Sequence, residues 1–213
     1  MTDFLTAHWL DITTTVLGLA YILLEYRASI WMWAVGFAMQ ALGIVLYYQK
    51  GLYADCGMEF YYLAMTMYGW WRWTHPKTKT HPQRLPVREG SDCSQGENTA
   101  MDITHLPFRE GLGVGLLALF LWVAIYWLLV MFTNSNVPLA DSFTTALSIV
   151  GIWALAHKYL EQWFIWIAVD VVTSVLYFYK DIPFKASLYA LYVVIAIFGY
   201  LKWRRLIHSG STR

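Results

Sequence analysis

The chain has 213 residues, of which 58% are hydrophobic and only 14% are charged. Soluble domains carry about 25% charged residues, so this composition is typical of an integral membrane protein. The formal net charge is +1 and the basic residues are spread over many segment ends, which gives no reason to expect a nucleic-acid partner.

Seven apolar runs are long enough to span a bilayer. They cover residues 9–26, 30–49, 53–73, 111–132, 140–157, 162–179 and 184–203. No Lys or Arg precedes Arg27, so we expect the first run to be a retained helix and not a cleaved signal peptide. The stretch "TNSNVPLAD" at 133–141 is a short turn, and it predicts Asp141 as the N-cap of the next helix.

The longest polar segment, 74–110, is rich in Pro, Gly and charged residues and is predicted to be a loop. Lys and Arg residues indicate its side of the membrane, because they favour cytoplasmic segments. With the N-terminus outside, twelve of the 15 Lys and Arg residues are inside, and only Lys50, Lys180 and Lys185 are outside. The sequence therefore predicts an outside N-terminus, a cytoplasmic loop at 74–110 and a cytoplasmic tail at 204–213.

The second half of the chain matches the first when Asp141 is aligned with Asp11. Residues 11–73 then align with 141–203 without a gap, and 14 of the 63 pairs are identical. The identities include Asp, Thr-Thr, Lys, Gly and Trp in one frame, which shared apolar composition does not easily produce. Each copy holds three helices, so two copies joined directly would have opposite orientations in the membrane. The extra run at 111–132 lies between them and gives both copies the same orientation, so the repeats are parallel. This predicts an all-α integral membrane protein with seven transmembrane helices in a 3+1+3, SWEET-like arrangement, with repeats at 9–73 and 140–203 and a linker helix at 111–132.

Such proteins usually hold their substrate between the repeats, near the middle of the membrane. Gln40 and Asp170 are equivalent mid-helix residues, and an intramembrane carboxylate is costly enough to indicate a function. Residues three, four and seven positions away share their helix faces. These are Trp33, Gly36, Gly43 and Tyr47 beside Gln40, and Trp163, Trp166, Thr173 and Tyr177 beside Asp170. Because Gly36 is the equivalent of Trp166, we expect a slot there that accepts an aromatic ring.

Several stretches resemble the PnuC family of bacterial nicotinamide riboside transporters. In the first repeat they are "SIWMWAVGF", "YYQKGLYAD" and "YYLAMTMYGWWRW". In the second they are "DSFTTALSIVGIWALAHKYLEQWFIWIAVDVVTSVLYFYK" and "GYLKWRR". The resemblance implies a seven-helix, SWEET-like uniporter of the bacterial cytoplasmic (inner) membrane. It also implies uptake of nicotinamide riboside by facilitated diffusion, followed by trapping through phosphorylation by a cytoplasmic kinase.

Nicotinamide riboside is a planar pyridinium cation with an amide and ribose hydroxyls, and the candidate residues suit each part. Trp163 and Trp166 can offer an indole face to the cation, and Asp170 can be its counter-ion or accept a hydrogen bond from ribose. The amide suits the side chains of Gln40 and of Gln162, where the family often has Asn. The candidate hydroxyl groups are those of Tyr21, Tyr47, Tyr177 and Thr173, and the candidate outer gate is Glu59 with Tyr62.

A plainer role stays open for several of these residues. Asp170 can hold helices together through a hydrogen bond. Trp163 can belong to the aromatic belt at the membrane interface, and Gly36 can serve close helix packing. Glu25 and Arg27 are expected to form a charge pair at a helix end.

Other classes of function find less support in the sequence. The six histidines lack metal-ligand spacing and no nucleophile is matched with a base, so we expect no enzyme, cofactor or metal. A seven-helix photoreceptor would need a mid-membrane Lys, but Lys185 and Lys202 lie at the ends of the last run. A proton-coupled symporter of a related cationic vitamin or nucleoside stays open, as does a homo-oligomer. We expect passive exchange, because the sequence indicates no second carboxylate at the midplane.

Overall fold

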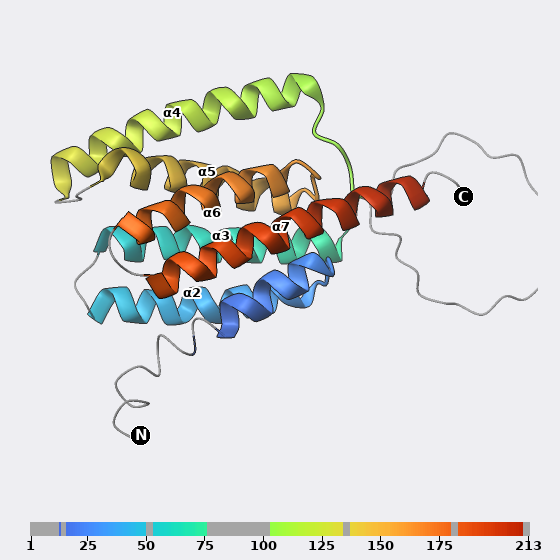
Figure 1. Cartoon of the computed structure of the whole chain (residues 1–213), viewed down its shortest axis with the longest axis horizontal. Helices are drawn as coiled ribbons and strands as arrows, with labels where there is room; N and C mark the ends of the chain where they lie inside the picture. The colour runs from blue at the N-terminus through green and yellow to red at the C-terminus, as the bar shows by residue number, and fades with distance from the viewer. Residues whose placement is uncertain are drawn as a thin grey trace, which may run out of the picture.

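The computed structural model describes residues 13, 16–49, 53–75, 103–133, 137–179 and 183–210 (Figure 1). A first helix, Val16–Tyr26, is followed by α2 (Trp31–Gln49), α3 (Tyr53–Thr74), α4 (Phe108–Phe132), α5 (Pro138–Ala156), α6 (Gln162–Tyr179) and α7 (Pro183–Gly210). These described ranges contain no strand, only one isolated bridge between Thr104 and Tyr159. The predicted all-α class with seven helices is therefore confirmed. The start of the first apolar run and most of the predicted loop lie outside the described residues.

Four of the described helices are long and apolar enough to cross a membrane. They are α4, α5, α6 and, within α7, Ala186–Ile207. Shorter apolar stretches, Val16–Tyr26 and Trp31–Val45, form the first helix and most of α2. Every helix also exposes large apolar side chains, which lipid tails accept and water opposes. The chain is thus a multi-pass membrane protein.

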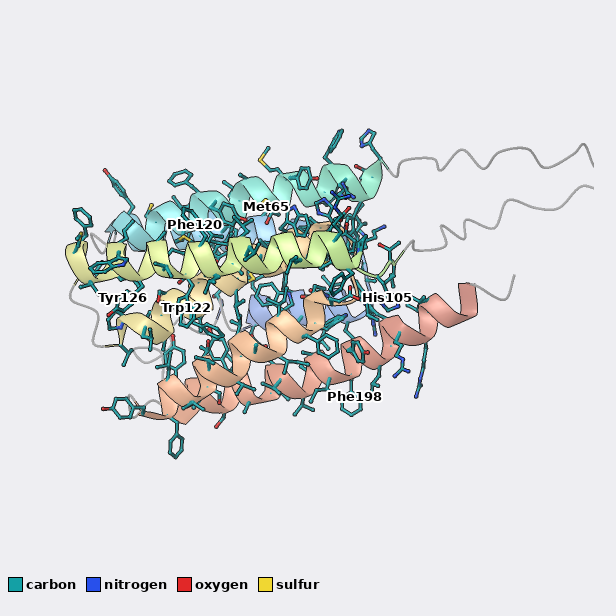
Figure 2. The ribbon with its side chains drawn as sticks, turned by 90° about the horizontal axis from the view of Figure 1, so that it is seen from above. Met65, His105, Phe120, Trp122, Tyr126 and Phe198 are labelled. Carbon is teal, nitrogen blue, oxygen red and sulfur yellow. The ribbon has the colours of Figure 1, made fainter. Side chains whose placement is uncertain are left out.

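Six of the described helices close into a ring, and α4 lies outside it. In the ring α2 packs on α3, α3 on α5, α5 on α6 and α6 on α7. The first helix closes the ring, because Tyr21 lies against Gly36 of α2 and Gly18 lies against Tyr192 of α7. The outer helix, α4, packs on α5 and has no buried residue. Figure 2 shows it across the outside of the bundle, where the Trp122 indole N–H donates to the carbonyl of Leu139 at 3.2 Å.

The chain segment before α4 is fixed to the turn between α5 and α6. Backbone hydrogen bonds of 3.2 and 3.0 Å join Thr104 to that turn. The carboxylate of Glu161 accepts the backbone N–H of Leu106 at 2.9 Å and lies 2.9 Å from Nδ1 of His105. Since Gln162 begins α6 directly after Glu161, these bonds fix the position at which α6 starts.

Two helix ends differ from the sequence prediction. The α5 helix begins at Pro138, and Val137 is its N-cap. Proline is favoured at this first helical position, because its φ angle already suits a helix and because backbone N–H groups in the first turn have no partner within the helix. Asp141 therefore lies inside the first turn and is not the N-cap; its carbonyl accepts the Thr145 hydroxyl at 2.7 Å. At the other end of the chain, α7 continues to Gly210, so most of the predicted tail is helical.

Several contacts recur at equivalent positions of the two sequence copies. The ring of Trp33 fills the space beside Gly69 and meets the ring of Trp73 edge-on, at 5.6 Å and 87°. The same arrangement, at 5.5 Å and 90°, is formed by Trp163, Gly199 and Trp203. The turns before α2 and α6 each hold a residue with positive φ, Ala28 at 51° and Lys158 at 58°. These matched contacts support the predicted repeat.

Candidate substrate site

One face of α6 carries polar side chains into the bundle. Its buried residues are Gln162, Trp163, Val169 and Asp170. Gln162 and Asp170 are 0% and 6% exposed, although most of their neighbours are apolar. Both amide atoms of Gln162 lack a hydrogen-bond partner among the described residues. Because an unpaired buried polar atom is costly, a ligand or water that pairs with this amide would stabilise the bundle.

Trp166 lies between these two polar residues on α6 and packs on α5. A Cβ at Gly151 would be 3.3 Å from atoms of the Trp166 ring. In the other repeat, Cε2 of Tyr21 lies 3.2 Å from the corresponding position at Gly36. In the repeat alignment Gly151 is equivalent to Tyr21, and Gly36 is equivalent to Trp166. Each copy therefore packs one aromatic ring on one glycine, but the helix that carries the ring in one copy carries the glycine in the other. The predicted slot at Gly36 is wrong, because Tyr21 and Thr66 fill that space.

Trp33 and Trp163 are packing residues in this conformation. Both side chains are completely buried. A glycine of the neighbouring helix meets each ring, and a second Trp meets it edge-on. A ring without a free face cannot stack on a ligand, so this placement differs from the predicted role of both residues in substrate binding.

The sequence pattern missed Glu25, which the structure brings to the site. Glu25 is 4% exposed and interacts with the side chains of Gln162 and Asp170. One of its carboxyl oxygens, Oε1, has no hydrogen-bond partner among the described residues. Arg27 is exposed, and within the part of the chain that the structure describes no ion pair joins it to Glu25, so the predicted charge pair at the helix end is wrong. The bundle therefore holds a second buried carboxylate close to Asp170.

The family described as nicotinamide mononucleotide transporter matches residues 8–205, which include all the described helices except the end of α7. The chain belongs to this transporter family. Its membrane-spanning helices agree with such membership, and the predicted resemblance to PnuC transporters is confirmed by relatives of that name.

Two curated relatives are similar to almost the whole chain. The riboflavin/roseoflavin transporter RibM of Streptomyces davaonensis is 27% identical over 197 residues, which cover 92% of this chain and 84% of the relative. The nicotinamide riboside transporter PnuC of Escherichia coli is 24% identical over 216 residues, covering 96% of this chain and 87% of the relative. A crystal structure of the vitamin B3 transporter PnuC has the same fold, with a TM-score of 0.69, 21% identity and coverage of 97% of this chain and 85% of that one.

The other residues predicted to contact the substrate lie on α2 and α6. Gln40 on α2 and Thr173 on α6 are partly buried. The ring of Tyr177 stacks on that of Tyr189, with centroids 5.4 Å apart and planes at 15°. Tyr47 lies in α2, but its side chain is outside the part that the structure describes.

The predicted outer gate, Glu59 with Tyr62, is on α3. The carboxyl carbon of Glu59 lies 2.8 Å from the position that a Cβ of Gly43 would take, so Gly43 makes room for this carboxylate between α2 and α3. Tyr62 meets the ring of Tyr61 edge-on at 5.7 Å, and the Tyr61 hydroxyl donates to the carbonyl of Ile149 on α5 at 3.1 Å. The described residues contain no group of His, Cys, Asp and Glu that could hold a metal ion.

Proposed function

We propose that this transporter carries nicotinamide riboside across the bacterial cytoplasmic membrane, with its N-terminus outside and its C-terminus inside. The observation that supports this substrate best is the buried face of α6, where Asp170 lies one turn beyond Trp166. A buried carboxylate beside an indole suits a planar cation, and a pyridinium nucleoside is such a cation. The nicotinamide riboside transporter of Escherichia coli is similar over nearly the full chain.

The parts of this substrate match the order of residues along α6. Gln162 and Asp170 are eight residues apart, which is about 12 Å along a helix. The carboxamide would pair with the amide of Gln162, whose two polar atoms lack partners among the described residues. The pyridinium ring would lie against Trp166, where a cation gains about 0.5–2 kcal/mol from an indole. Asp170 would be the counter-ion or accept from ribose, with Thr173 and Gln40 as further polar groups.

We further propose uptake by facilitated diffusion, with a cytoplasmic kinase trapping the nucleoside by phosphorylation. Proton-coupled symport is the rival mechanism. It gains support from Glu25, because a second carboxylate is then buried near Asp170, and carboxylates inside the membrane are typical of proton relays in transporters. In proteoliposomes, labelled nicotinamide riboside should equilibrate without accumulating, whether or not a pH gradient is applied. Uphill accumulation driven by the pH gradient would contradict facilitated diffusion and favour symport.

Riboflavin is a second candidate substrate, because the riboflavin/roseoflavin transporter is similar over 92% of this chain. Its planar ring is also suited to Trp166, but it is neutral at pH 7 and needs no counter-ion. Thermal stabilisation of the purified protein by nicotinamide riboside, nicotinamide, nicotinamide mononucleotide, thiamine and riboflavin separates these candidates. We expect the largest shift with nicotinamide riboside. A larger shift with riboflavin would overturn the proposed substrate.

A further inference from the structure

Glu25 is a buried carboxylate of the first helix, and no ion pair among the described residues explains its burial. It comes from the first helix, in the last turn before the chain enters α2, and it is 4% exposed. Its side chain lies near that of Gln162, the first residue of α6, but no hydrogen bond of ordinary geometry joins them. Glu25 Oε1 and both amide atoms of Gln162 stay without partners among the described residues. One acceptor and one amide therefore lie side by side with unused hydrogen-bonding capacity.

The repeat indicates that the fold does not need polar residues at these positions. In the alignment of the two copies, Glu25 corresponds to Leu155, and Gln162 corresponds to Met32. Both apolar equivalents are completely buried. The same places in the bundle thus accept Leu and Met in one half and hold Glu and Gln in the other. Since buried polar groups cost stability, the polar pair points to a ligand and not to packing.

We propose that Glu25 contacts the ligand directly and, with Gln162, recognises the amide edge of a planar ring. Glu25 accepts a hydrogen bond from the ligand N–H, and the Gln162 amide donates to the adjacent carbonyl. This inference deepens the proposed function, because the carboxamide of nicotinamide riboside presents such an N–H beside a carbonyl. The imide of riboflavin presents the same edge, so one subsite suits the named ligands of both curated relatives.

In its ionised form, Glu25 makes the subsite selective. A ligand with a carboxylate in place of the amide would set a second negative oxygen against Glu25, and it would have no N–H to donate. Asp170, also buried and near Glu25, adds to this repulsion. A hydrogen bond to a charged group contributes about 1.5–3 kcal/mol, or about tenfold to a hundredfold in affinity. Nicotinic acid riboside should therefore bind at least about tenfold more weakly than nicotinamide riboside.

The test transfers the apolar pair from one half of the bundle to the other. The double variant Glu25→Leu with Gln162→Met should fold, because Leu155 and Met32 already fill the equivalent positions. Binding is measured on full-length detergent-purified protein with two ligand pairs, nicotinamide riboside against nicotinic acid riboside and riboflavin against N3-methylriboflavin. Glu25→Gln keeps the shape and removes the charge. Glu110→Gln is the matched control, because Glu110 is exposed and its carboxylate accepts a hydrogen bond from the Tyr159 hydroxyl at 3.0 Å.

We expect the double variant to lose about tenfold or more in affinity for the ligand with the N–H and to stop distinguishing the members of its pair. Glu25→Gln should lose most of the discrimination between amide and carboxylate, and Glu110→Gln should bind as wild type does. Wild-type affinity and discrimination in both Glu25 variants would overturn the inference. If the double variant fails to fold, Glu25→Gln alone decides.

The proposed function can fail separately. If wild type binds riboflavin and not nicotinamide riboside, the proposed substrate is wrong, and the role of Glu25 is judged on the riboflavin pair. Equal loss for both members of a pair in Glu25→Gln would mean a structural role and would contradict direct contact. If wild type binds none of the four ligands, both proposals are wrong.

Discussion

Replacing Gly199 by Ala tests the packing around Trp163. The new Cβ would lie 2.5 Å from Cη2 and 2.7 Å from Cζ2 and Cζ3 of Trp163, whereas carbons in contact are about 3.5–4.0 Å apart. The ring would have to move by roughly 1 Å. It is completely buried, and the ring of Trp203 lies edge-on at 5.5 Å, so the ring has little room to move.

The expected magnitude follows from two opposing terms. Overpacking a well-filled core costs about 1–3 kcal/mol. Ala is favoured over Gly inside a helix by about 1 kcal/mol. Because the Trp163 ring is held on both sides, we expect Gly199→Ala to lower the free energy of unfolding by about 1–2 kcal/mol. Gly69→Ala should have the same effect, because Trp33 lies against Gly69 in the equivalent way.

The assay is thermal unfolding in detergent without ligand. Gly113→Ala and Gly115→Ala are matched controls, because among the described residues no atom beyond the adjacent helix backbone lies within 4 Å of a Cβ at either position. They should keep or raise the melting temperature. Combining Gly199→Ala with Trp163→Phe, which shortens the ring, should recover part of the loss. If Gly199→Ala melts as high as Gly113→Ala, the packing argument is refuted.

Three further predictions concern the ligand and the topology. Trp166→Ala should weaken ligand binding about tenfold, since it removes a stacking surface worth about 1–2 kcal/mol, and Trp166→Phe should retain part of it; equal binding by all three proteins in calorimetry would exclude stacking. Asp170→Asn should weaken a cationic ligand more than its neutral isostere, whereas equal loss for both would indicate a structural carboxylate. Cys93, which lies outside the described residues, should react with a membrane-impermeant maleimide only in opened cells once Cys56 is replaced. Labelling in intact cells would overturn the predicted orientation.

The sequence predicted the architecture well because its strongest signals are local. Apolar runs of helical length identified the helices, and the spacing of Trp163, Trp166 and Asp170 indicated one face of α6. The structure confirms that Trp163 and Asp170 are buried on that face. Helix ends were less certain, because Pro138 and not Asp141 decides where α5 begins.

The sequence failed for Glu25 because the deciding contact is not local. Beside Arg27 at the end of an apolar run, an acidic residue indicates a solvated charge pair. In the structure it is 4% exposed and lies beside Gln162, the first residue of α6. A signal was nevertheless present in the repeat, since the position equivalent to Glu25 holds Leu155, and a charge that replaces a core residue is unusual.

The repeat separates packing residues from candidate ligand residues more sharply than residue type does. Trp33, Gly69 and Trp73 are identical to their equivalents in the second copy, and both sets form the same edge-on ring contacts. These residues, identical in the two copies, therefore have the same packing role in each half of the bundle. Tyr47 and Tyr177 are identical, but the residues given the main contacts with the ligand differ between copies: Asp170 replaces Gln40, Trp166 replaces Gly36, and Glu25 stands where the other copy has Leu155. A ligand without two-fold symmetry needs such differences, because it must bind in one orientation between two similar halves.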